Sequence, residues 1–242
     1  MIHWLTQSHE TMPGTATSTL LSASVSFQKS TFLSDSEADR LATLTTEKRR
    51  RDWLLGRWTA KRLLQTVIWE TSHTTVPLDL ITVANNADGV PTIASQLPLV
   101  DGKYSISLSH AHGQALVAAV AKPNWPIGCD IEKVAPRSEA FIDDYFTEAE
   151  ALLVRQVAGT QRDVLVTAVW SAKESVLKAL HLGLSVDTRS VACLIDPTIR
   201  PSDSWVPFKV WCDNGRLPHP APHFSGWWRV MGGFVLTLVV EQ

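Results

Sequence analysis

The sequence predicts an α+β protein made of two similar halves, each with helices packed on a small antiparallel sheet. Helical patterns followed by strands with period-two alternation occur twice along the chain. A proline-bounded segment, Lys122-Pro123-Asn124-Trp125-Pro126, separates the two occurrences. The 242 residues suffice for two domains of about 120 residues each. We therefore expect an N-terminal half at residues 1–122 and a C-terminal half at 123–242, with any active site in the cleft between them.

The N-terminal half begins with Ser- and Thr-rich residues 1–33, which predict a lead-in strand preceded by a loose tail, with apolar patches at Leu20-Leu21 and Val25-Ser26-Phe27. Ser34 and Glu37 form a capping-box pattern that opens a short helix. Residues 47–70 predict a long amphipathic helix, whose apolar stripe comprises Leu63, Leu64, Val67 and Ile68. This stripe leaves a basic face that holds Arg50, Arg57 and Lys61.

Alternating apolar residues between turn residues predict four strands in the N-terminal half, at 80–84, 91–94, 103–109 and 114–121. The C-terminal half should begin with a strand at 127–134. A helix capped by Thr147 and Glu150 follows, and then a longer helix at about 162–182 that ends at Gly183. Four more strands are predicted at 189–195, 206–212, 226–231 and 233–240.

Composition excludes several classes of protein. Hydrophobic residues make up 45% and charged residues 19%, which is typical of a globular protein, and the net charge of −2 argues against a nucleic-acid binder. Seven basic residues do cluster between Lys48 and Arg62, a density that suits a small polyanionic ligand. Three widely spaced cysteines indicate a reducing compartment. Neither a signal peptide nor a membrane span is recognisable, so we expect a cytoplasmic protein without a membrane partner.

Three carboxylates and a lysine form the most informative constellation. In Gly128-Cys129-Asp130-Ile131-Glu132, the two carboxylates project to one side of a strand while Cys129 and Ile131 point into a core. Gly128 leaves room there for a bulky ligand. On the later helix, Trp170, Glu174 and Lys178 share one face. If that helix crosses the strand, Glu174 completes a site of hard oxygen ligands suited to Mg²⁺.

Each candidate also has a simpler interpretation. Asp130 and Glu132 could be the solvent face of a strand, and Glu174 with Lys178 an ordinary helix ion pair. The basic face of the first long helix could be solvated, or it could clamp phosphates.

Two turns are open to interpretation as well. The Ser109-His110 turn with His112 could bind zinc, although no further ligand follows at a suitable spacing, or it could contact phosphate. Residues 86–91 could be only a turn, or a backbone shelf for a nucleobase.

Together these motifs resemble the 4′-phosphopantetheinyl transferases, specifically the larger pseudodimeric group typified by the surfactin synthetase-activating enzyme. Gly128 to Glu132 resembles the family's GxDxE motif, and Trp170 to Glu174 with Lys178 resembles its WxxKE…K motif. Ser109-His110 is similar to its SxSH turn, and Arg57 to the arginine that binds the 3′-phosphate of coenzyme A. Asp88-Gly89-Val90-Pro91 is similar to its GKP-like turn, but Val90 stands where the family often has lysine.

The resemblance implies a Mg²⁺-dependent transfer of 4′-phosphopantetheine from coenzyme A to a serine of an acyl or peptidyl carrier protein, with release of 3′,5′-ADP. The metal ligands would be Asp130, Glu132 and Glu174. Glu174 would also be the general base, directly or through water, and Lys178 would stabilise the transferring phosphoryl group. Contacts to coenzyme A would come from Arg50, Arg57, Lys61, Gly89, Pro91, Ser109, His110 and Lys178.

The resemblance further implies carriers of fatty acid, polyketide or nonribosomal peptide synthesis as partners. The carrier would dock around residues 181–195. A monomer is expected, because two halves in one chain supply the cleft that smaller relatives build between subunits.

Two other functions remain open from the sequence. One is a metal-dependent phosphodiester hydrolase that uses the same carboxylates on a nucleotide. The other is a non-catalytic coenzyme A-binding module, which the missing lysine at Val90 prompts.

Overall fold

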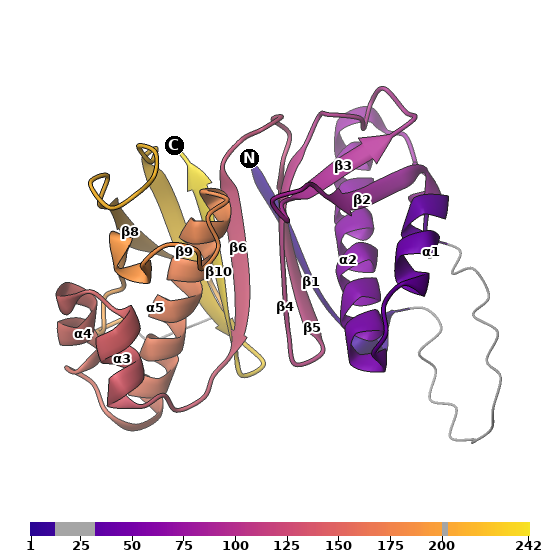
Figure 1. Cartoon of the computed structure of the whole chain (residues 1–242). Coiled ribbons are helices and arrows are strands. Elements are labelled where there is room, and N and C mark those ends of the chain that lie inside the picture. Colours follow the sequence, from indigo (N-terminus) through magenta and orange to yellow (C-terminus); the bar gives the residue numbers. More distant parts are fainter. Residues whose placement is uncertain (13–31, 200–202) are drawn as a thin grey trace, which may run out of the picture. The chain divides into compact units, whose positions relative to one another are not determined.

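The computed structural model describes residues 1–12, 32–199 and 203–242 (Figure 1). The chain divides into two compact units, Met1–Asn124 and Trp125–Gln242, and the division falls within the proline-bounded segment. In the described residues, no helix combines the length and apolar character needed to cross a membrane.

The N-terminal unit packs one long helix against a three-stranded antiparallel sheet of order β1-β5-β4. Its core joins the apolar stripe of that helix to buried residues of the sheet, among them Ile106, Val117 and Ala119. A separate hairpin of β2 and β3 lies beside the helix (Figure 1). The elements in chain order are β1 (Ile2–Ser8), α1 (Asp35–Ala42), α2 (Glu47–Ser72), β2 (Ile81–Asn85), β3 (Pro91–Ser95), β4 (Ser105–Ala111) and β5 (Gln114–Val120).

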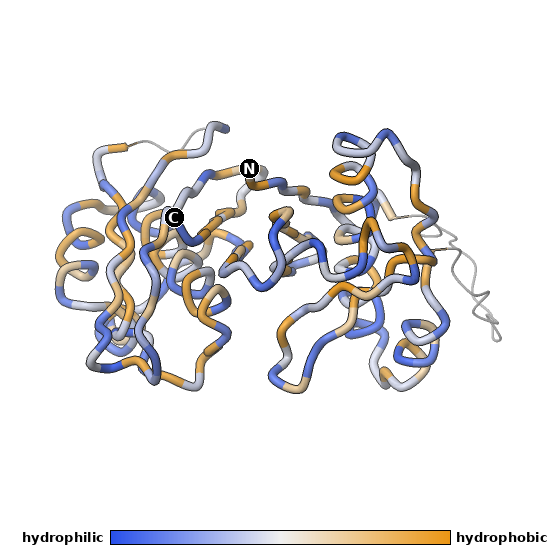
Figure 2. The backbone as a smooth tube through the Cα atoms, turned by 90° about the horizontal axis from the view of Figure 1, so that it is seen from above, coloured by the Kyte–Doolittle hydropathy of each residue, from blue (hydrophilic) through white to orange (hydrophobic). Residues whose placement is uncertain are grey.

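The C-terminal unit lays helix α5 across a five-stranded antiparallel sheet of order β6-β10-β9-β8-β7, with α3 and α4 beyond the helix (Figure 1). The helix α5 packs mainly on β6 and β10. Helix tubes of both units carry alternating hydrophobic and hydrophilic residues (Figure 2). The elements are β6 (Ile127–Lys133), α3 (Glu139–Tyr145), α4 (Glu148–Val154), α5 (Gly159–Ala179), β7 (Val191–Leu194), β8 (Val206–Cys212), β9 (Phe224–Met231) and β10 (Phe234–Glu241).

The expected mixture of helices and antiparallel strands is confirmed, with most boundaries within two or three residues. The lead-in strand is an exception, because β1 occupies Ile2–Ser8, where a loose tail was expected. The patches at 20–21 and 25–27 lie outside the described residues. Helix α3 was not predicted, and α5 ends at Ala179 instead of continuing to Gly183, because Leu180 already caps it.

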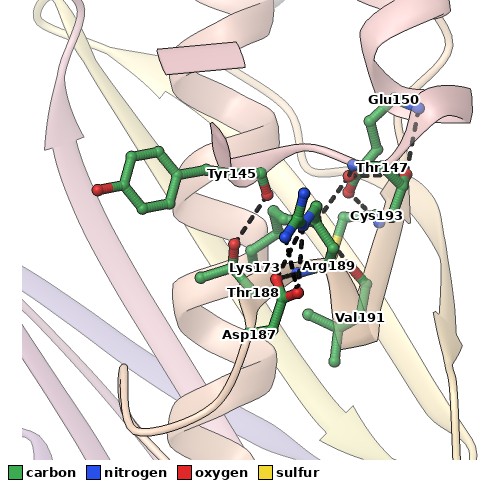
Figure 3. A network of polar contacts seen from close by, with 9 residues as sticks. All are labelled: Tyr145, Thr147, Glu150, Lys173, Asp187, Thr188, Arg189, Val191 and Cys193. Atoms are coloured by element: carbon green, nitrogen blue, oxygen red, sulfur yellow. Dashed lines mark hydrogen bonds and ion pairs between the residues drawn. The ribbon is translucent and has the colours of Figure 1, made fainter. Parts of the chain in front are cut away.

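A buried lysine–glutamate pair stabilises the helix layer of the C-terminal unit (Figure 3). Glu150 closes the capping box with Thr147 at the start of α4. One of its oxygens accepts a hydrogen bond from Lys173 Nζ at 2.6 Å, and the other accepts one from the Cys193 backbone N–H at 2.7 Å. The pair therefore ties two helices to strand β7.

The N-terminal unit contains the same arrangement. Glu37 closes the capping box of α1 with Ser34, and its carboxylate pairs with Lys61 and accepts from the Val83 backbone N–H in β2. The two lysines also lie in matching sequences, Trp58-Thr-Ala-Lys61 and Trp170-Ser-Ala-Lys173. Both units thus use one hydrogen-bonding pattern to fix a long helix.

Candidate functional site

The crossing of strand β6 and helix α5 is set by Gly128. A Cβ at this position would lie 1.8 Å from the backbone oxygen of Ser175, so only glycine permits this approach. The expectation that Gly128 leaves room for a ligand is wrong, because the helix backbone fills that space. The expected crossing of helix and strand is found.

Asp130 lies at the centre of this crossing and is only 4% exposed. Its Oδ1 accepts a hydrogen bond from Lys178 Nζ at 2.6 Å, and its Oδ2 accepts one from the Ser171 hydroxyl at 2.8 Å. Lys178 Nζ also donates to the Cys129 carbonyl at 3.2 Å. Both carboxylate oxygens therefore have partners, as a buried charge requires.

Glu132 and Glu174 complete the acidic group around Asp130. Burial raises the pKa of Glu174, and repulsion from Asp130 raises it further, against the attraction of Lys178. Burial and repulsion from Asp130 also raise the pKa of Glu132, while Arg137 and a hydrogen bond from Trp170 oppose the rise. Trp170 itself packs edge-on against Phe141, with ring centroids 5.1 Å apart.

Burial and the negative charge of Asp130 act in opposite directions on the pKa of Lys178. Burial alone would lower the pKa of this amine, but attraction to Asp130, together with their hydrogen bond, raises it overall. The lysine is therefore a cation at neutral pH. Its side chain is 27% exposed, and its ammonium is hydrogen-bonded to Asp130 and to the Cys129 carbonyl.

The chemistry of these side chains fits a divalent cation. Glu132 and Glu174, whose pKa values are raised by burial and by the charge of Asp130, would gain from a cation beside them, and carboxylate oxygens are the ligands Mg²⁺ prefers. Within the described ranges, however, no three ligating side chains lie close enough together to form a finished metal centre. The orientation of Glu132 or Glu174 would have to adjust on binding.

A cavity of about 960 Å³ opens in the N-terminal unit between helix α2, α1 and the β2 hairpin. Four basic side chains line it, Arg40, Lys48, Arg49 and Arg57, against the acids Glu37 and Asp52. Glu37 is paired with Lys61, and Asp52 lies 3.1 Å from Lys48. The cavity therefore favours an anion.

Three of the predicted coenzyme A contacts, Arg57, Gly89 and His110, line this cavity. Arg57 is fixed by hydrogen bonds to the Val83 carbonyl and to Asn85 Oδ1, and it stacks over the Trp53 ring at 4.7 Å. Burial lowers the pKa of Arg57 from its very high ordinary value, and Glu37 opposes that shift.

Four other predicted contacts are not among the residues that line the cavity: Arg50, Lys61, Pro91 and Ser109. Lys61 is fully buried, and its ammonium binds Glu37 and the Phe32 carbonyl. The expectation that Lys61 forms part of an accessible basic face is therefore wrong. Arg50 donates its Nε–H to the Leu44 carbonyl, and Ser109 is 8% exposed in β4.

Sequence reasoning missed several residues of the cavity, including Arg40, Lys48, Arg49 and Trp53. The two at 48 and 49 belonged to the basic cluster noticed in the sequence. Arg40 comes from a separate helix, and no local pattern ties it to α2.

The segment expected to contact a carrier protein mixes packed and exposed residues. Leu182 and Val186 pack on the core of the C-terminal unit, whereas Leu184 is 60% exposed. Arg189 forms an ion pair with Asp187 at 3.0 Å.

Carboxylates beside a lysine ammonium are side chains that a metal-assisted group transfer can use. Residues 126–219, which make up most of the C-terminal unit, match the model of the 4′-phosphopantetheinyl transferase superfamily. The match covers less than half of the chain and lies wholly within the C-terminal unit.

A curated relative and two solved structures show similarity. The chain is 27% identical over 93 residues to the 4′-phosphopantetheinyl transferase gsp of Aneurinibacillus migulanus, a match that covers 38% of each protein. The holo-[acyl-carrier-protein] synthase of Thermotoga maritima is 18% identical, with a TM-score of 0.37, over 60% of this chain and 74% of that one. A complex of the Chronobacterium ammoniagenes synthase with coenzyme A is 15% identical, with a TM-score of 0.36, over 49% and 93%.

Proposed function

We propose that this chain transfers the 4′-phosphopantetheine group of coenzyme A to a serine of an acyl or peptidyl carrier protein and releases 3′,5′-ADP. The observation that carries the proposal is the group of Asp130, Glu132 and Glu174 with Lys178, inside the segment that matches the superfamily. The proposal is also supported by a curated relative that bears the name 4′-phosphopantetheinyl transferase, although the match covers only 38% of that protein.

The N-terminal unit would contribute phosphate contacts. Arg57 is preorganised by its bonds to Val83 and Asn85, and Arg40, Lys48 and Arg49 add positive charge around it. Trp53 offers a flat apolar surface in the same cavity. These groups replace Lys61 in the proposed ligand set, and they supply the positive charge that Val90 does not.

The C-terminal unit would carry the chemistry. When bound, Mg²⁺ would neutralise charge on the pyrophosphate of coenzyme A. Glu174, whose raised pKa makes it a stronger base than an ordinary glutamate, would accept the proton of the carrier serine, directly or through water. Lys178 would place its ammonium against the phosphoryl oxygens that develop charge.

We further propose that the two units are diverged copies of one ancestral unit that act together within a monomer. Three features support this: the strand orders β1-β5-β4 and β6-β10-β9, the repeated Trp-x-Ala-Lys sequence, and the matching pairs of Glu37 with Lys61 and Glu150 with Lys173. In this comparison Arg62 stands in the N-terminal unit where Glu174 stands in the C-terminal unit. Only the C-terminal copy would therefore bind the metal.

Purified protein incubated with Mg²⁺, coenzyme A and a panel of apo-carriers tests the function. Mass spectrometry should detect one added phosphopantetheine on at least one carrier. Glu174→Gln should slow the addition by about 100-fold or more, while replacement of the exposed Glu148 on α4 by Gln should not. Absence of the added mass on every carrier would contradict the proposal. Release of 3′,5′-ADP without a carrier would instead indicate a hydrolase.

A further inference from the structure

Three buried hydroxyls lie directly behind Asp130. The Ser171 Oγ is 2.8 Å from Asp130 Oδ2 and 2.9 Å from Thr237 Oγ1, and the Ser175 Oγ is 2.7 Å from Thr237 Oγ1. All three residues are fully buried. Ser171 and Ser175 are one turn apart on α5, and Thr237 is the cross-strand partner of Asp130 in β10.

The direction of the first hydrogen bond follows from chemistry. An ionised carboxylate can only accept, so the single hydroxyl proton of Ser171 points to Asp130. Thr237 can then donate to Ser171, either to its hydroxyl or to its backbone oxygen at 3.0 Å, and Ser175 can donate to Thr237. The three hydroxyls are thus able to align as donors toward the carboxylate.

Other buried hydroxyls on the long helices behave differently. Thr167 donates to the Asp163 carbonyl one turn back, and Thr59, which occupies the position of Ser171 in the repeated sequence, donates to the Leu55 carbonyl. Such bonds to the preceding turn are the usual choice of helical Ser and Thr. Ser171 instead spans from the helix to the strand, which indicates a specific role toward Asp130.

We propose that Ser171, supported by Thr237 and Ser175, is a positioning residue that fixes Asp130 so that the carboxylate offers one oxygen, Oδ1, to the cation. This inference rests on the proposed function. With Oδ2 held by Ser171, Oδ1 is the oxygen that accepts from the Lys178 ammonium at 2.6 Å, and a cation bound at Oδ1 would take the place of that ammonium. A preset carboxylate binds a cation more tightly than one that must be ordered first, because outer groups that orient a ligand usually contribute 10–100-fold in affinity.

Cation binding without coenzyme A tests this role. Mn²⁺ titrations followed by electron paramagnetic resonance should show binding by the wild-type chain and about 10-fold weaker binding by Ser171→Ala. Ser171→Thr, which keeps the hydroxyl, should restore affinity, and the isosteric Thr237→Val should weaken it less than Ser171→Ala. Thr167→Val is the matched control, because it removes a buried hydroxyl of the same helix that does not contact Asp130.

A second step separates positioning from a general loss of structure. In the Asp130→Asn background, removal of the Ser171 hydroxyl should change the residual Mn²⁺ affinity no further, since its effect passes through the carboxylate. Equal Mn²⁺ affinities of wild type, Ser171→Ala and Thr237→Val would overturn the inference while leaving the proposed function intact. A wild-type chain that binds no Mn²⁺ would overturn both the inference and the metal site of the proposed function.

Discussion

Glu174 is the one residue of the proposed site that would serve both as a metal ligand and as the general base. Its carboxylate is held near two others, and its pKa is raised by burial and by Asp130. A carboxylate whose pKa is raised by folding destabilises the folded state above that pKa, because the charged form is less favourable there than in the unfolded chain. Function would therefore oppose stability at this position.

Replacement of Glu174 by Gln should separate these two effects. We expect the transfer rate to fall by about 100-fold or more, as for the loss of a general base. Without divalent cations at neutral pH, the melting temperature should be unchanged or higher, since a desolvated charge is removed. Calorimetry and the mass assay measure the two quantities, with Glu148→Gln as the control. A melting temperature clearly below that of the wild type would contradict this account.

The same pKa shifts predict a pH dependence for cation binding and for stability, with opposite signs. As pH falls through the raised pKa values of Glu132 and Glu174, the folded protein takes up protons before the unfolded chain does. The metal-free protein should therefore gain stability from these two groups as pH falls toward the ordinary glutamate range, while Mn²⁺ affinity declines. Urea denaturation and Mn²⁺ titration between pH 7 and 5 measure the two trends. If stability and Mn²⁺ affinity changed in the same direction with pH, the predicted pH dependence would be wrong.

At the scale of single elements, Gly128 determines how closely strand β6 approaches helix α5. Gly128→Ala should cost at least 1–3 kcal/mol, because its Cβ would overlap a backbone atom that cannot rotate away. Gly56→Ala is the informative contrast. Its Cβ would lie 3.1 Å from the flexible end of Leu108, in the interior of α2, where alanine is the better helix former.

Urea denaturation of the two alanine variants measures how much each substitution lowers the free energy of unfolding. The Gly56 variant should lie within about 1 kcal/mol of the wild type, and the Gly128 variant should be clearly less stable. If the Gly128 variant were equally stable, the tight crossing would not be set by this glycine.

The elements themselves were largely predictable from the sequence. The capping boxes at Ser34 and Thr147 give the starts of α1 and α4, and Gly232-Gly233 forms the turn between β9 and β10. Burial of charged residues was not predictable in the same way. Lys61 and Arg57 lie on a helix face that looks solvated until Glu37 and the β2 strand, distant in sequence, cover it. Periodicity places residues on faces, whereas the covering of a face depends on tertiary packing.

In the candidate site, too, periodicity predicted some residues, whereas others depend on tertiary packing. Asp130, Glu132, Glu174 and Lys178 were identified because strand and helix periodicities place them on shared faces. The hydroxyls behind Asp130 were not, because serine and threonine are common in both elements and Thr237 reaches the site only through strand pairing. The sequence also drew attention to Gly128, but the expected ligand beside it is in fact the backbone of helix α5. A glycine indicates that another group approaches closely without indicating which group it is.

For the whole molecule, the two units carry the same buried lysine–glutamate pair, yet only the cavity arginines should bind ligand. Lys61→Met should reduce stability by about 3–5 kcal/mol, because Glu37 would be left as an unpaired buried charge. Arg49→Ala should leave stability nearly unchanged, since this residue lies on the exposed rim of the cavity, and should weaken coenzyme A binding by roughly 10-fold.

Calorimetric titration of coenzyme A into each variant, corrected for its folded fraction, distinguishes the two roles. Lys61→Met should bind coenzyme A with wild-type affinity per folded molecule. If Lys61→Met instead lost affinity for coenzyme A while its stability was unchanged, Lys61 would be a coenzyme A contact after all.

The indole of Trp170 gives the acidic crossing a built-in optical signal. Its hydrogen bond to Glu132 and its packing on Phe141 and Tyr145 couple the ring to the charge beside it. Any cation that draws Glu132 away from this contact would alter the polarity that the excited indole senses. The difference in emission between the wild type and Trp170→Phe would then follow occupancy in real time, without a label and without a carrier protein.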